Sequence, residues 1–293
     1  MGGTRRVGGS GEADREARTA ADGVTAAAPA ALAALERLRP RLAASGLGLG
    51  LADVGESGLA PAGPAEASAA ATMPPRRRRE FLAGREAARR ALRAVGVECG
   101  EIPREGRLPV FAPGRAASLS HSAGIAVAVA RAPGGHAPLG CDLELRPLPC
   151  DAARLVLGPD EEPLLGTAAG AGAGTWSLTG LFSAKETAWK ALHLAPDRAG
   201  TASMRTLRDL RAEPCGDALH IGPRIDPHVG RSGRPRVGAS SGPSGQPCTG
   251  PRAGQSYGVR VRVLPVGAGV FSYALGWAGA DGRSTPVPTA RRS

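Results

Sequence analysis

The sequence predicts a fold that mixes α-helices with β-strands, and three segments carry that prediction. Residues 80–96 place Phe81, Ala88 and Leu92 on one face at helical spacing, and Gly96 suits a helix end. Residues 178–194 form a second strong helix candidate. Residues 257–264 alternate apolar and polar side chains, which is typical of a strand with one face in solvent.

Weaker patterns complete the order of elements. An Ala-rich helix is expected over 25–44, interrupted near Pro40, and a strand over 46–54, where glycine alternates with leucine. Residues 55–75 have the composition of a linker. The remaining expectations are buried strands at 124–130 and 139–145, a short helix at 160–165, one or two strands within 204–221, and a strand at 270–277.

Two stretches are too polar and too rich in glycine or proline to form a core. These are residues 1–24 and residues 222–256, and both lack hydrophobic periodicity. We therefore expect a largely disordered extension within 1–45 and a disordered insertion at about 222–256. No internal repeat is evident by inspection.

The charge balance favours anionic partners. The chain has 37 Lys and Arg against 26 Asp and Glu, a net charge of +11, which suits nucleic acid, phosphorylated cofactors, anionic membranes or acidic proteins. A single-strand nucleic-acid surface needs stacking aromatic side chains, and aromatic residues make up 3% of this chain. A nucleic-acid-binding protein is therefore a weaker alternative.

Several signals favour a cytoplasmic location. The N-terminal residues lack the apolar core of a secretion signal, and no stretch approaches the ~18 apolar residues that a membrane span needs. The five cysteines are odd in number and include no CxxC pair, which indicates a reduced protein with incidental thiols.

Lysine usage singles out one helix. Lys185 and Lys190 are the chain's two lysines, and they flank Glu186 in a protein that otherwise uses arginine for its basic side chains. A compact ammonium suits a reacting phosphate better than a planar guanidinium does. A structural alternative remains, because Ser183 and Glu186 have the spacing of a helix capping box and Glu186 and Lys190 that of a helical ion pair.

Asp142 and Glu144 form a second candidate. They lie two residues apart on an expected strand, so both carboxylates face the same side. Hard oxygen ligands of this kind suit Mg²⁺, which often completes its shell with substrate phosphates. The alternative is a solvated strand face that ends at the Pro147 turn.

Arginine and histidine supply further candidates. Arg85 lies within the apolar face of the helix at 80–96 and needs an anion, either a phosphate or a buried carboxylate. Ser120 and His121 precede the buried strand at 124–130, where His121 could donate to a phosphate. The same pair leaves open a Ser-His hydrolase, to which the GxSxG at 238–242 adds little because it sits in a Gly/Pro/Ser linker.

Four ordered motifs resemble the 4′-phosphopantetheinyl transferases of the enterobactin-type and surfactin-type bacterial branch. Leu139–Glu144 resembles the family's [VI]G[VI]D-x-E block, and Phe182–Lys190 resembles its [FW][ST]xKE-x-x-x-K block about forty residues later. Arg77–Arg85 and Ala117–His121 match the family's RRxEFxxxR and GS[LI][ST]H elements. The chain departs modestly, for example with Leu139 and Cys141 in place of β-branched residues and Ala117 in place of glycine.

This resemblance implies an α+β fold. Its two similar halves, each a small antiparallel sheet with a long helix, would be related by a pseudo-twofold, with the active site in the cleft between them. The halves would be residues 46–138 and residues 139–287.

The resemblance also implies an enzyme, with coenzyme A as co-substrate and Mg²⁺ as cofactor. The phosphopantetheine arm would move onto a serine of an apo acyl or peptidyl carrier protein, and 3′,5′-ADP would leave. The carriers would be acidic partners from siderophore, polyketide, nonribosomal peptide or fatty-acid biosynthesis, and no nucleic acid, no membrane and a monomeric enzyme are expected.

Each site residue has an expected role in this reaction. Glu186 or a metal-bound water would take the serine proton, and Lys190 and Lys185 would bind and offset the charge of the transferring phosphates. The metal ligands would be Asp142, Glu144 and Glu186, and the coenzyme A contacts would come from Arg77, Arg85, Arg107, Ser120, His121, Asp142, Lys185 and Lys190.

Overall fold

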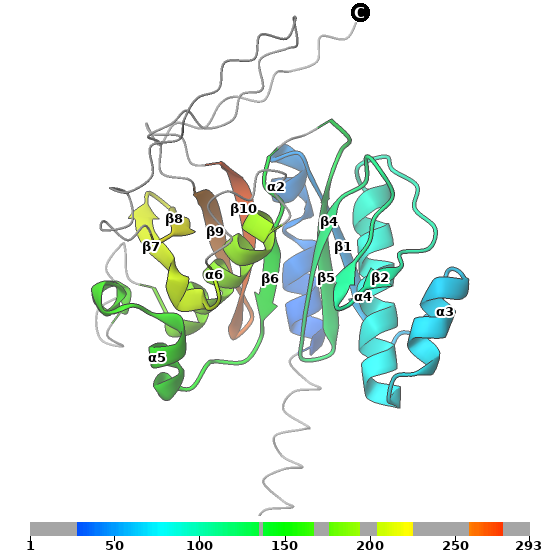
Figure 1. The fold of residues 1–293 in the computed structure, drawn as a ribbon, viewed down its shortest axis with the longest axis horizontal. Helices are drawn as coiled ribbons and strands as arrows, with labels where there is room; N and C mark the ends of the chain where they lie inside the picture. The colour runs from blue at the N-terminus through cyan, green and yellow to red at the C-terminus, as the bar shows by residue number, and fades with distance from the viewer. Residues whose placement is uncertain (1–27, 135–136, 167–175, 194–203, 225–257, 278–293) are drawn as a thin grey trace, which may run out of the picture. The chain divides into compact units, whose positions relative to one another are not determined.

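The computed structural model describes residues 28–134, 137–166, 176–193, 204–224 and 258–277 (Figure 1). Helices and small antiparallel sheets alternate along this part of the chain, which confirms the predicted α+β class. The GxSxG motif lies outside the described residues. So does the insertion expected at about 222–256, apart from residues 222–224.

The chain divides into two compact units. Unit 1 comprises residues 1–135, 142–147 and 264–271, and unit 2 comprises residues 136–141, 148–263 and 272–293. The strands form three sheets, with the orders β1-β5-β4, β2-β3 and β6-β10-β9-β8-β7. The predicted halves, their pseudo-twofold and the cleft between them stay predictions.

Unit 1 is built on the three-stranded sheet. Its strands are β1 (Leu47–Asp53), β5 (Ile125–Arg131) and β4 (Ala117–Ser122), and β5 pairs antiparallel with both neighbours. The helix α4 (Pro75–Arg93) contacts all three strands. The smaller elements are a helix at 28–36, α2 (Arg39–Ala44), α3 (Pro64–Ala71), β2 (Arg104–Glu105) and β3 (Leu108–Pro109).

The Gly-Leu alternation of β1 explains why α4 approaches so closely. A Cβ atom on Gly50 would lie 1.9 Å from the Ala87 carbonyl oxygen, and one on Gly48 would lie 2.2 Å from that of Ala91. The leucines of β1 point the other way and are buried as well. Alanines dominate the core under α4, so helix backbone and sheet backbone lie almost in contact.

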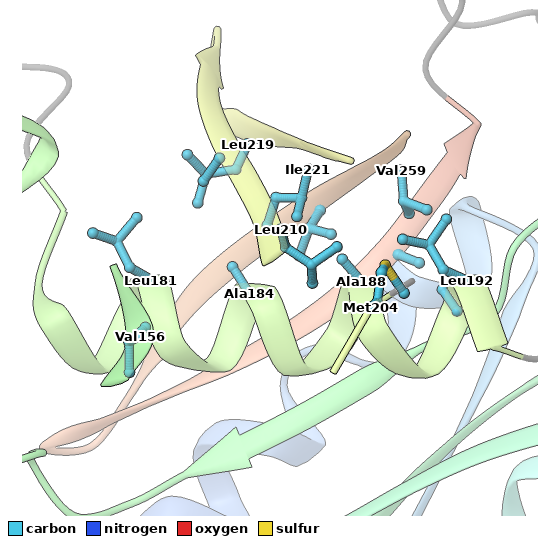
Figure 2. Close-up of a cluster of buried hydrophobic side chains, with 14 of the residues drawn as sticks. Val156, Leu181, Ala184, Ala188, Leu192, Met204, Leu210, Leu219, Ile221 and Val259 are labelled. Atoms are coloured by element: carbon cyan, nitrogen blue, oxygen red, sulfur yellow. The ribbon is translucent and has the colours of Figure 1, made fainter. Parts of the chain in front are cut away.

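Unit 2 centres on α6 (Leu178–His193). Figure 2 shows its apolar face, with Leu181, Ala184, Ala188 and Leu192, packed against side chains of neighbouring strands. The remaining elements are η1 (Cys150–Ala152), α5 (Ala153–Val156), η2 (Pro159–Leu164), η3 (Leu207–Asp209), β7 (Leu210–Cys215), β8 (Ala218–Pro223) and β9 (Val259–Val266). Two further strands, β6 (Cys141–Glu144) and β10 (Gly269–Trp277), have residues in both units.

Several boundaries differ from the prediction. Residues 64–71 form the helix α3 where a linker was expected, because Glu66 turns inward and is fully buried. The helix α4 starts at Pro75, five residues early, since proline is tolerated in a first helical turn. For the same reason the break in the N-terminal helix falls at 37–38 and leaves Pro40 inside the first turn of α2.

Candidate functional site

A cavity of about 820 Å³ lies within unit 1 at the ends of β1, β4 and β6. Both signs of charge line it: cationic groups come from Arg76 and Arg146, and carboxylates from Glu80 and Glu144. His121 and Ser122 line it too, directly before the turn that joins β4 to β5.

That turn is a two-residue hairpin formed by Ala123 and Gly124. Ser122 pairs with Ile125 across it, and both turn residues have positive φ, 48° for Ala123 and 85° for Gly124. These values match a type I′ turn, which suits the twist of antiparallel strands. The turn fixes where β4 ends and therefore where His121 and Ser122 face the cavity.

Ser120 and Ser122 connect β4 to the carboxylate motif. The Ser120 hydroxyl donates to Asp142 Oδ1 over 2.8 Å, and the Leu145 amide donates to the Ser122 hydroxyl over 3.0 Å. Asp142 is 3% exposed, whereas Glu144 is half-buried and lines the cavity. The structure therefore brings together Ser120, Asp142, Glu144 and His121, which the sequence had singled out separately.

His121 belongs to a small charge cluster at the cavity edge. Arg77 Nη1 lies 2.9 Å from His121 Nε2, and because a guanidinium has no acceptor, the guanidinium is the donor in this contact. Glu80 accepts from Arg76 over 3.1 Å and from Arg77 over 3.3 Å. Burial favours a raised pKa for Glu80, but the two arginines and His121 outweigh it, so the pKa lies below its usual value.

The geometry does not support the hydrolase alternative. Ser120 and His121 are neighbours on a strand, so their side chains point to opposite faces. Ser120 donates to Asp142 and His121 contacts Arg77, which is not the order of nucleophile, base and orienting acid that a Ser-His-Asp triad requires.

Arg85 and Arg107 are not among the residues that line this cavity. The Arg85 guanidinium is 6% exposed, donates to the Ile102 and Pro103 carbonyls, and stacks over Phe81 at 4.6 Å. Burial lowers its pKa to about 10. Arg107 is exposed between β2 and β3. Their predicted contacts with coenzyme A stay predictions.

In unit 2 the motif residues of α6 divide between two faces. Glu186 and Lys190 are partly exposed, and Lys190 Nζ donates to the Cys141 carbonyl over 3.1 Å. Lys185 is fully buried and forms an ion pair with Glu161 at 2.7 Å. Burial lowers the pKa of Lys185, although Glu161 opposes that shift.

The alternative explanation of Ser183 and Glu186 as a capping box is wrong. The helix α6 starts five residues earlier, at Leu178, and the Ser177 hydroxyl accepts the Gly180 amide in the manner of a cap. Ser183 lies inside the helix, where its hydroxyl is 2.7 Å from that of Ser272 in a buried cluster that also includes Thr187.

Sequence reasoning missed several residues of the cavity, among them Asp53, Arg76, Glu80, Ser122 and Arg146. Arg76 begins a run of four arginines, and such charge runs are usually solvated. Arg146 lies two residues beyond the end of β6, in a bend where strand alternation does not say which way a side chain points.

Neither a cluster of potential metal ligands nor a helix that could span a membrane is found in the described residues. Within them, no group of three or more His, Cys, Asp or Glu side chains is arranged to hold a metal ion. The helices of this described part are also too short or too polar to cross a membrane. The oxygen chemistry of Asp142 and Glu144 nevertheless suits Mg²⁺, which needs one or two carboxylates when phosphates supply other ligands.

Residues 65–131 match the 4′-phosphopantetheinyl transferase N-terminal domain family. The match covers α3, α4, β4 and β5, and so contains Ser120 and His121. The match covers less than half of the chain and supports a relation of this segment to the phosphopantetheinyl transferases, a family of transferases that use coenzyme A and act on carrier proteins. No curated protein matches the chain.

Proposed function

We propose that this protein transfers the 4′-phosphopantetheine arm of coenzyme A to a serine of an apo carrier protein and releases 3′,5′-ADP. The observation that carries the proposal is the 2.8 Å hydrogen bond from Ser120 to Asp142. Ser120 lies inside the region that matches the transferase family, and Asp142 lies outside it. The acidic motif, found independently of that match, therefore contacts the matched region through this bond, and its second carboxylate, Glu144, lines the cavity.

The cavity offers suitable chemistry for the phosphates of coenzyme A. Arg76 and Arg146 carry permanent positive charge, and Arg77 is 56% exposed beside His121. Guanidinium groups bind phosphate oxygens in pairs, and His121 can donate from Nδ1. A phosphate would compete with Glu80 for the same arginines.

Asp142 and Glu144 would hold Mg²⁺, with phosphate oxygens of coenzyme A as further ligands. The ion would supply charge neutralisation at the pyrophosphate. Ser120 helps by fixing the Asp142 carboxylate, since a hydrogen bond to one oxygen sets the orientation of the other.

The reaction itself is a phosphoryl transfer. A bond forms between the carrier serine oxygen and the β-phosphorus of coenzyme A, and the bond from that phosphorus to the oxygen bridging it to the α-phosphate breaks. The serine proton passes to Glu186 or to water, and 3′,5′-ADP carries the leaving negative charge. Lys190 would bind that charge as it develops, which is the main form of catalysis in this reaction class.

Finer assignments belong to the same proposal. The motifs favour the enterobactin-type and surfactin-type branch, acidic carriers suit the net charge of +11, and we expect a cytoplasmic monomer.

The direct test incubates the purified protein with coenzyme A, Mg²⁺ and an apo carrier protein, and then measures the intact mass of the carrier. The expected result is a mass gain of one phosphopantetheine arm, abolished by Asp142→Asn and Glu144→Gln. Glu213→Gln on β7, an exposed carboxylate outside the cavity, is the matched control and should retain activity. An unchanged carrier mass with a panel of apo carriers would refute the proposal.

A further inference from the structure

Lys185 has no hydrogen left to donate. Its ammonium is 0% exposed and donates to the Val156 carbonyl at 2.8 Å, the Leu210 carbonyl at 2.9 Å and Glu161 Oε2 at 2.7 Å. An ammonium has three hydrogens, so these three acceptors use all of them. A phosphate could reach this group only by displacing partners in the protein interior.

Glu161 is held just as firmly. It is 1% exposed, and its Oε1 accepts the Ala212 amide at 2.7 Å. Its Oε2 accepts the Gly158 amide at 2.8 Å and Arg224 Nη2 at 2.6 Å. Through Lys185 and Glu161, the end of α5, the turn η2 and the start of β7 are therefore all tied to one point on α6.

Unit 1 repeats this arrangement around Arg85. Arg85 is buried in α4, and its Nε donates to the Ile102 carbonyl at 2.8 Å. The fully buried Glu66 accepts the Ile102 amide at 2.8 Å, as Glu161 accepts that of Ala212. In both helices a buried cation thus reaches backbone carbonyls beside a buried glutamate.

The likeness extends five residues along each helix. Arg90 Nη1 donates to the Leu51 carbonyl at 2.7 Å, and Lys190 Nζ donates to the Cys141 carbonyl at 3.1 Å. Each acceptor directly follows a glycine that lies under the helix backbone: Gly50 under Ala87, and Gly140 under Thr187. The two helices therefore carry the same order of residues: a buried cation, then a glutamate, then a cation that binds a strand carbonyl. In α4 these are Arg85, Glu86 and Arg90. In α6 they are Lys185, Glu186 and Lys190.

We propose that Lys185 is a positioning residue, a buried anchor that sets the rotation and height of α6, and that it does not touch coenzyme A. This replaces the phosphate contact expected from the sequence, and it rests on the function proposed above. The anchor would hold Glu186 and Lys190 on the partly exposed face of α6. Lysine suits the position because three acceptors surround one nitrogen, a geometry that a planar guanidinium cannot reproduce.

The first test uses the unmodified protein. Lys185 and Lys190 are its two lysines, so an amine-acetylating reagent followed by peptide mass mapping reports on each separately. We expect Lys185 to stay unmodified with or without coenzyme A and to react in urea. Lys190 should react in the native protein and be protected by coenzyme A. Native reactivity of Lys185 that coenzyme A suppresses would overturn the proposal.

The second test compares Lys185→Met with Lys185→Met/Glu161→Gln. The single variant leaves Glu161 facing unpaired carbonyls and should melt at a lower temperature, whereas the neutral pair should regain stability. Below the melting temperature of each, we expect the single variant to lose about tenfold or more in kcat, the scale of a small misplacement. The coenzyme A Kd should stay within about threefold of wild type, and the double variant should regain kcat.

A direct phosphate contact predicts a different pattern. A folded double variant with coenzyme A affinity as weak as that of Lys190→Met would overturn the anchor role. Failure of the proposed function is separable, because wild type would then transfer no arm and coenzyme A would protect neither lysine. In that case native protection of Lys185, its exposure in urea and rescue of the melting temperature by the double variant still decide whether it is an anchor.

Discussion

Lys190 and Lys185 are five residues apart but have different surroundings. Lys190 is partly exposed, with a hydrogen bond to the Cys141 carbonyl, while Lys185 lies in the interior of unit 2. The lysine bias of the sequence marked both, because both positions need a compact ammonium. It could not separate their roles, since burial of one lysine and exposure of the other depend on which side of α6 faces the sheet.

Lys190→Arg should lose most transfer activity although it keeps the charge. The guanidinium is larger and planar, so it cannot occupy the same point beside Cys141 and a phosphate. We expect a loss in kcat/KM on the order of 10²–10³, comparable to removal of one charge-stabilising donor. The measurement is the steady-state rate of carrier modification. Arg205→Lys, just before η3, is the control, because it makes the opposite exchange of arginine for lysine. Turnover near that of wild type would show that Lys190 is a structural cation.

Predictions from the sequence agree best with the structure where a local residue pattern can pack in one way. Asp142-x-Glu144 fell on a strand as expected, because its apolar neighbours fit a buried strand. The sequence left open whether Arg85 binds a phosphate or a buried carboxylate. In the structure Arg85 donates to backbone carbonyls, with Glu66 nearby. The acceptors come from Ile102 and Pro103, a loop whose position no local pattern encodes.

At the scale of elements, two helices rest directly on glycine. A Cβ on Gly140 would lie 2.1 Å from the Thr187 carbonyl oxygen and 3.1 Å from the Ala191 side chain. The sequence showed Gly140 as part of a family motif but gave no reason for it. The structural reason is that α6 passes over it without room for a side chain.

Gly140→Ala should therefore lower the free energy of unfolding by about 1–3 kcal/mol, as overpacking does. Because α6 carries Glu186 and Lys190, activity should fall more than stability alone explains. Denaturant unfolding and transfer rate measure the two effects. Gly100→Ala is the matched control, since a Cβ there meets nothing within 4 Å, and it should behave as wild type. Equal stability of the two variants would contradict the close approach.

The repeated contact pattern was not visible in the sequence. The buried cation is arginine in α4 and lysine in α6, and α4 has Arg89 and Arg93 where α6 has Trp189 and His193. Glu86 bonds Arg89, Arg90 and Arg93, so the same helical position serves a salt-bridge network in one unit.

At the scale of the whole molecule, the chain connects β8 and β9 by a segment much longer than their separation requires. Ile221 pairs with Val259 across the two strands, and a Cβ on Gly258 would lie 3.1 Å from the Ile221 carbonyl oxygen. The flanks of residues 225–257 are therefore neighbours in one sheet. A connection of ordinary hairpin length is sufficient to join them.

Replacing residues 225–257 with about six Gly and Ser residues should leave melting temperature and transfer activity close to wild type, because loop length changes closure entropy only slowly. A version that also removes Arg224 is the control. It should be less stable, since Arg224 binds both Asp160 and the buried Glu161. Insoluble protein from the first variant would mean that the replaced residues contribute to the core.

The β4–β5 turn has a consequence for how this protein would respond to selection. Ala123 occupies a left-handed backbone conformation that costs an alanine roughly 1–2 kcal/mol and that asparagine or glycine adopts more readily. A single substitution at Ala123, two residues after His121, should therefore raise the stability of the protein. Selection for stability at higher temperature should therefore replace Ala123 early. Where alanine persists at this position, another requirement keeps it there.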